Sequence, residues 1–192
     1  MGTWLDIIGS VIVGSLALML LLRVNFQVSN NSREISTNGM VQSNLSGLGV
    51  VVEYDLYKIG YRVPSSTVKI TSSGLNQLTY LADTNYSRDV PTVVHTIKYY
   101  LGDTSQAHIT SNPNDKPLFK SIDNVSRVVA LVRDCQFTYF DSTGVQISDT
   151  SVNGRKLIRI VKVYMKAESA DLINNYYQTA EYTRKIKPMN LK

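Results

Sequence analysis

Apolar residues dominate the start of the chain. Residues 5–22 read LDIIGSVIVGSLALMLLL, with Asp6 as the one charged residue and no proline. An α-helix of this length extends about 27 Å, close to the hydrocarbon thickness of a bilayer. Because a helix satisfies its own backbone hydrogen bonds in lipid, the pattern predicts a membrane-spanning helix.

Two features of this run are candidates for function. Asp6 places a carboxylate at the edge of an apolar helix, where it is costly unless a partner neutralises it; the alternative is a headgroup-level acid that favours the helix N-terminus. Ser10 and Gly14 form a step of small residues four apart, which lets a second helix approach closely. Both features fit a helix that packs against copies of itself.

The helical spacing continues beyond the apolar run. Residues 29–44 are polar, and apolar residues then return three and four positions apart up to Ile59. We therefore predict one helix over residues 4–60, loosened near Asn38-Gly39 and ended by Gly60. Its length of about 85 Å exceeds what a domain of this size can bury, so its first half belongs in a membrane or among other subunits.

Beyond Pro64 the pattern changes to a period of two, which is typical of strands. The predicted strands are Leu75–Ala82, Val93–Leu101, Cys135–Phe140, Leu157–Met165 and Tyr177–Ile186. Leu118–Val132 fits either a short helix or a strand, and Val152-Asn153-Gly154 is predicted to be a turn. The fold class is therefore α+β, with the C-terminal half of the helix packed on an antiparallel β-sheet head.

Three parts are expected from this pattern. Residues 1–25 form an apolar helix that lies in a membrane or among other subunits, residues 26–63 its amphipathic continuation, and residues 64–192 a globular β-sheet head domain.

Positive charge gathers at the C-terminal end. The net charge is +5, and residues 155–192 hold nine lysines and arginines against three acids, which leaves +6 there. Such a surface can meet an anion, or it can be the solvated face of a sheet. The candidate anion-binding residues are Arg155, Lys156, Arg184, Lys185 and Lys187.

Catalytic and metal-binding patterns are missing from the sequence. Cys135 is the only cysteine and is expected to be a buried apolar side chain, while His95 and His108 stand at no ligand spacing. No phosphate-binding or dinucleotide-binding glycine motif occurs. We expect no enzyme activity, no metal and no cofactor.

Several stretches in order along the chain resemble type IV pilins, in particular PilW-type minor pilins and the J-type pseudopilins of type II secretion. VVEYDLYKIGY at Val51–Tyr61 is similar to the family's "DLR-AGY" at the end of the long helix. FTYFDSTG at Phe137–Gly144 resembles its "F-Y-D-x-x-G" hairpin, and LIRIVKVYMKAES at Leu157–Ser169 its "I-x-x-V-x-V-x-L" strand. Aligning Gly2–Asp6 with the family's F-T-L-I-E puts Asp6 at its glutamate.

The resemblance implies a subunit of an extracellular filament. The helix would be stored in the cytoplasmic membrane and then bundled with copies of itself, with Asp6 pairing with a neighbour's terminal amine. The implied partners are copies of the chain, the membrane before assembly, and the pilus or secretion machinery of the cytoplasmic membrane. Nucleic acid is not an expected partner.

Two other functions stay open. The chain fits a minor pilin or pseudopilin at the tip of a pilus or secretion system, and it also fits a membrane-anchored binding module for DNA or anionic surfaces. The charge pattern argues against an extracellular head, because Arg23 and Arg33 follow the span and the positive-inside rule then favours a cytoplasmic one.

Overall fold

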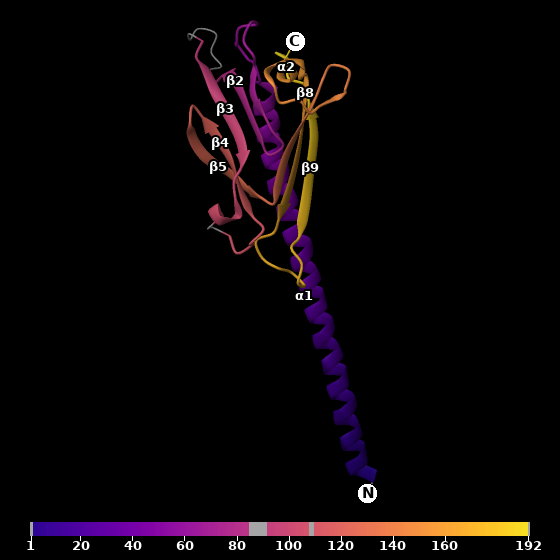
Figure 1. Ribbon diagram of the computed structural model, residues 1–192. Helices are drawn as coiled ribbons and strands as arrows, with labels where there is room; N and C mark the ends of the chain where they lie inside the picture. Colours follow the sequence, from indigo (N-terminus) through magenta and orange to yellow (C-terminus); the bar gives the residue numbers. More distant parts are fainter. Residues whose placement is uncertain (1, 85–91, 108–109, 192) are drawn as a thin grey trace.

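A single long helix and two antiparallel sheets make up the protein. The structure, a computed structural model, describes residues 2–84, 92–107 and 110–191. Helix α1 (Gly2–Tyr57) has 56 residues, and its N-terminal half extends far from the head, so that the two chain ends lie at opposite ends of the molecule (Figure 1). The predicted α+β fold, a long helix followed by antiparallel strands, is confirmed, and it is consistent with a pilin-like fold.

The five-stranded sheet has the strand order β1-β2-β3-β4-β5. Its strands are β1 (Ile70–Ser73), β2 (Gln77–Asp83), β3 (Val94–Leu101), β4 (Lys116–Ile122) and β5 (Val125–Val132). A 3₁₀ turn, η1 (Thr104–Gln106), follows β3. Every neighbouring pair is antiparallel.

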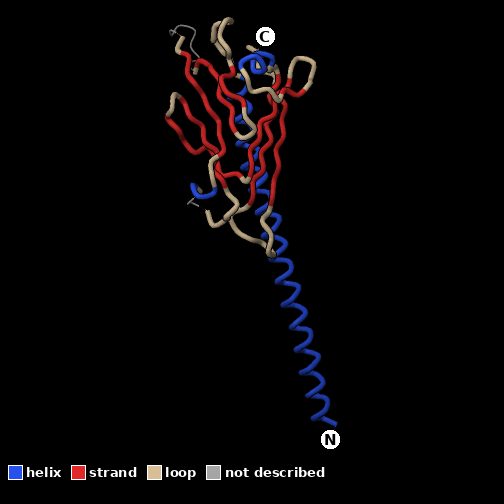
Figure 2. The backbone as a smooth tube through the Cα atoms, in the orientation of Figure 1, coloured by secondary structure: helices blue, strands red, loops and turns tan. Residues whose placement is uncertain are grey.

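The four-stranded sheet has the order β7-β6-β8-β9 and is also antiparallel. Its strands are β6 (Asp134–Phe140), β7 (Gln146–Ile147), β8 (Ile160–Glu168) and β9 (Thr179–Ile186), and a short helix α2 (Val152–Leu157) precedes β8. Only Arg133 separates β5 from β6, so the chain passes directly from one sheet to the other. The loops gather at the two ends of the head (Figure 2).

One core joins the helix to both sheets. The buried α1 residues are Val41, Leu45, Leu48, Gly49, Val52, Asp55 and Leu56, which lie on one face at helical spacing. They pack with inward-facing residues of both sheets, such as Tyr80 and Tyr99 from one and Phe137 and Val163 from the other. Cys135 is buried as predicted, and this burial, followed by the charge of Asp134, raises the pKa of its thiol to about 12.

Some predicted boundaries differ from the structure. Helix α1 ends at Tyr57, three residues early, and Gly60 (φ +76°) then lies in the turn that follows. The loosening predicted near Asn38-Gly39 is absent, since α1 runs through both residues as α-helix. Extending an existing helix costs far less than starting one, so these weak helix formers are carried along.

Two segments differ in type. Leu118–Val132 is neither one helix nor one strand but most of the β4–β5 hairpin, closed by Asp123 and Asn124 with φ of 48° and 71°. Val152-Asn153-Gly154 starts helix α2 instead of forming a turn, because the Ser151 side chain caps it by accepting from the Gly154 N–H at 3.2 Å. As a result, strand β8 begins at Ile160 and not at Leu157.

Candidate functional site

The N-terminal half of α1 exposes apolar side chains around its whole circumference. Every residue from Gly2 to Arg33 is exposed, including Trp4, Ile8, Leu16 and Met19. The most apolar eighteen-residue window of α1 has a mean hydropathy of 2.4, and none of it is buried. By length and composition, α1 is therefore able to cross a membrane.

The predicted assembly residues lie on this exposed segment. Asp6, Ser10 and Gly14 follow one another at intervals of four, so they share one face of the helix. The Ser10 hydroxyl donates to the Ile7 carbonyl at 2.9 Å, and Ser15 donates to Ile12 at 2.8 Å, which satisfies both polar groups inside the helix. No atom lies within 4 Å of a Cβ placed on Gly14, so this position is open to another helix.

The outer face of α1 remains apolar where the helix lies against the head. Val50, Val51, Tyr54 and Tyr57 are exposed on the side opposite the buried face. Val50 has 65 % of its surface exposed although it sits beside the core residue Gly49. The apolar surface of the N-terminal half therefore continues along the head.

A buried ionic cluster fixes α1 to the five-stranded sheet. The Asp55 carboxylate accepts from the Tyr99 hydroxyl and the Lys120 ammonium, and its backbone carbonyl accepts from the Tyr80 hydroxyl at 3.1 Å. Burial, and then the charge of Asp55, raises the pKa of both tyrosines. The sequence contained Asp55 within the DLYKIGY motif but could not identify its partners, which come from β2, β3 and β4.

The next contacts fix α1 to β9. Tyr182 donates to Glu53 at 3.0 Å, and Arg184 forms an ion pair with Glu53 at 3.4 Å. A Cβ placed on Gly49 would lie 2.5 Å from the Tyr182 ring. In the turn that follows the helix, Arg62 pairs at 3.0 Å with Asp83 at the end of β2, whose side chain is fully buried.

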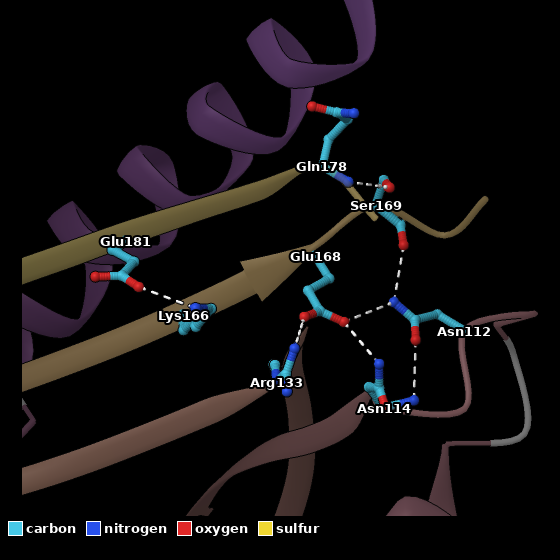
Figure 3. A network of polar contacts seen from close by, with 8 residues as sticks. All are labelled: Asn112, Asn114, Arg133, Lys166, Glu168, Ser169, Gln178 and Glu181. Atoms are coloured by element: carbon cyan, nitrogen blue, oxygen red, sulfur yellow. Dashed lines mark hydrogen bonds and ion pairs between the residues drawn. The ribbon is translucent and has the colours of Figure 1, made fainter. Parts of the chain in front are cut away.

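A polar network holds the loops at the end of the head nearest the N-terminal half of α1 (Figure 3). The Glu168 carboxylate accepts from Arg133, from Asn114 at 3.0 Å and from Asn112 at 3.3 Å. Asn112 also donates to the Ser169 carbonyl at 2.9 Å. Burial alone would raise the pKa of Glu168, but these hydrogen bonds outweigh burial and lower it.

The predicted basic residues do not form one continuous surface of free charges. Arg184 is paired with Glu53, and the Lys185 ammonium lies 4.6 Å from the centre of the Phe140 ring. Arg155 and Lys156 belong to α2, and Lys187 is exposed just beyond β9. Arg155 and Lys156 instead share a hollow with Lys69 and Arg159, two residues that were not singled out in the sequence.

The structure describes one of the two histidines, His95. The His95 Nδ1 lies 2.5 Å from an Asp123 carboxylate oxygen, whereas His108 lies outside the described residues. Within residues 2–84, 92–107 and 110–191, no group of three or more histidine, cysteine, aspartate or glutamate residues is arranged to hold a metal ion.

No family model matches this chain, and neither a curated protein nor a solved structure matches it. What the protein does is therefore inferred from its own residues and their geometry.

Proposed function

We propose that the chain is a structural subunit of a type IV pilus-like extracellular filament. The observation that carries this proposal is the N-terminal half of α1, which is apolar on all sides, wholly exposed, and continuous with the part of α1 that packs on the head. An apolar surface of this extent needs lipid or other protein around it. A subunit held in a membrane and then bundled with its copies meets both needs in turn.

Assembly then transfers the helix from lipid to a protein bundle. The step gains little from the hydrophobic effect, since lipid and helix side chains are similarly apolar, so close packing and polar pairing decide it. Ser10 and Gly14 permit close approach. Asp6 neutralises a positive charge of a neighbouring helix. In an apolar bundle, two opposite charges that pair are far more stable than either charge without a partner. Val50, Val51, Tyr54 and Tyr57 extend the contact along the head.

The test is electron microscopy of material sheared from cells that produce the chain. Asp6→Asn keeps the size of the side chain and removes its charge, so filaments should be lost while the protein stays in the membrane. Asp6→Glu keeps the charge and is the matched control, which should still form filaments. Asn31→Asp, an added acid farther along the exposed helix, controls for a general effect of changing its charge.

A tip-located minor pilin or pseudopilin is the second candidate, favoured by the similarity of VVEYDLYKIGY and FTYFDSTG to those types. In that case filaments persist in cells that lack the chain. In cells that produce it, an antibody against the chain labels only the filament ends. If no filament forms and the head is protected from external protease in intact cells, both filament functions are excluded and a cytoplasmic head follows.

A further inference from the structure

A hollow of about 310 Å³ lies at the end of the head farthest from the chain's N-terminus. Its walls are the loop before β1 and helix α2, close to the C-terminal end (Figure 1). Four basic residues line it, namely Lys69, Arg155, Lys156 and Arg159. We call this hollow the distal pocket.

Hydroxyl groups complete the lining. Ser65, Ser66 and Thr67 belong to the lining on the side of the loop, which is turned by a hydrogen bond from the Thr67 N–H to the Pro64 carbonyl at 3.1 Å. Helix α2 is held in place through its Ser151 cap and through Gly154, where an added Cβ would lie 2.4 Å from the Asp149 carbonyl. The two walls therefore come from firmly folded elements.

Three of the four basic groups are positioned by backbone carbonyl oxygens. Lys69 donates to the Asn190 carbonyl, Arg155 to the Thr150 carbonyl, and Arg159 to the Lys156 carbonyl at 2.7 Å. Carbonyl oxygens fix a cation's direction but carry no net charge. Among the described residues, the ion pairs of the head involve other cations, and no carboxylate lines the distal pocket.

Arg155 is only partly satisfied by its surroundings, since its Nε is buried and has no hydrogen-bond partner within the described part of the chain, which is costly for a charged donor. Arg155 also interacts with Asp149, outside the lining, whose pKa is lowered first by hydrogen bonds from Ser151 and then by the charge of Arg155. Among the described residues, one carboxylate against four cations leaves the pocket with a net positive charge.

We propose that the distal pocket binds the phosphate group of a small phosphorylated ligand. Guanidinium and hydroxyl groups match the oxygens of phosphate, and a phosphomonoester carries about two negative charges at neutral pH, enough to balance the surplus of cations. A long polyanion fits less well, because two further basic residues of strand β9, Arg184 and Lys185, are engaged with Glu53 and Phe140. The site is independent of the filament proposal.

The test is calorimetric titration of the full chain in neutral detergent at low salt. The probes are inorganic phosphate and ribose 5-phosphate, with ribose as the uncharged control. Both anions should bind saturably; tighter binding of ribose 5-phosphate identifies a sugar phosphate, and equal affinity identifies free phosphate as the source. The double variant Lys156→Gln/Arg159→Gln should weaken binding about tenfold or more, as expected for the loss of charge-assisted hydrogen bonds.

The matched control removes the same charge elsewhere. Lys162 and Lys185 face each other on β8 and β9 outside the distal pocket, and Lys162→Gln/Lys185→Gln should change the affinity by less than about twofold, the effect of screened surface charges. Lys156→Gln alone alters an exposed side chain, keeps the fold, and should still weaken binding about threefold, a partial loss of one charge-assisted bond.

Three outcomes overturn the proposal. The first is no saturable binding of either anion. The second is equal weakening in the pocket variants and in the Lys162/Lys185 control, which indicates general surface charge. The third is that an unphosphorylated oligothymidylate binds more tightly than either probe and loses affinity equally in all variants, which indicates an extended nucleic-acid surface.

Discussion

At the scale of single residues, Asp55 decides how α1 meets the five-stranded sheet. A buried carboxylate is tolerated only when it is paired and hydrogen-bonded, and Asp55 has both Lys120 and Tyr99. Because the side chains of Lys120 and Asp55 are still 25 % and 11 % exposed, solvent screens part of their attraction. The pair therefore contributes less than a wholly buried one.

Asp55→Asn should lower the free energy of unfolding by about 2 kcal/mol, since it leaves Lys120 without its charge partner. Urea unfolding of the full chain in detergent measures this. In a double-mutant cycle with Lys120→Met, the double variant should lose about 1 kcal/mol less unfolding free energy than the sum of the losses in the two single variants. Tyr80→Phe, which removes only the bond to the Asp55 carbonyl, should cost about 1 kcal/mol. A coupling of zero between Asp55 and Lys120 would contradict this account.

Glu168 gives a pH dependence of known sign. A carboxyl whose pKa is lower in the folded chain than its usual value of 4.5 stabilises the fold above that value and loses this effect as the pH falls through the folded pKa. Glu168→Gln should therefore be less stable than the wild type by about 1 kcal/mol at pH 7, and the difference should shrink as the pH falls below 4.5 and through the folded pKa of Glu168.

The wild type and Glu168→Gln must be compared at each pH, because Asp115 at the same end of the head changes the pH dependence of stability in the opposite direction. Burial raises the pKa of Asp115. Unfolding midpoints in urea across this range measure the difference. A gap between the wild type and Glu168→Gln that widens on acidification would show that the assigned sign is wrong.

At the scale of elements, two glycines of α1 have opposite surroundings. Gly49 is buried against the Tyr182 ring on β9, while a Cβ placed on Gly47 meets nothing within 4 Å. Both cost helix propensity relative to alanine, but only Gly49 is required by a close approach.

Gly47→Ala should stabilise the protein by about 0.7 kcal/mol, the gain in helix propensity. Gly49→Ala should destabilise it by about 1 kcal/mol, because moving the Tyr182 ring breaks its packing and its bond to Glu53. Thermal unfolding of both variants measures the contrast. If Gly49→Ala were as stabilising as Gly47→Ala, the contact between α1 and β9 would be looser than described.

At the scale of the whole molecule, the head and the exposed half of α1 have separate requirements. The first buried α1 residue is Val41, so nothing before it belongs to the core. The chain therefore combines a self-contained fold with a long apolar segment that depends on its surroundings.

Removing residues 1–28 should give a head that is soluble without detergent and unfolds cooperatively, because the described residues of this segment, 2–28, are all exposed. Removing residues 1–45 also takes Val41 and Leu45 from the core and should destabilise the head by about 3 kcal/mol or more. Sedimentation and thermal unfolding of the two truncations test this. Aggregation of the shorter deletion would show that the apolar helix supports the head.

Much of the fold follows from local patterns. Three patterns depend only on residues close together in the sequence: the apolar run, the helical spacing up to Ile59 and the alternation of most strands. They can therefore be recognised without knowledge of the fold. The β4–β5 hairpin also had a signal, since Asp123-Asn124 favours the left-handed backbone of a two-residue turn. Helix α2 was missed because Asn153-Gly154 resembles a turn unless the Ser151 cap is recognised.

Contacts between distant residues were decided only by the tertiary structure. Asp55 stands 44 residues from Tyr99 and 65 from Lys120, and Lys69 lies far along the chain from Arg155 and Arg159. Periodicity reports which face of an element is buried, whereas partners depend on strand order and register. The sequence by itself thus determined an apolar helix bearing Asp6 and a β-rich head; the buried ionic cluster and the distal pocket exist because folding brings separated charges together.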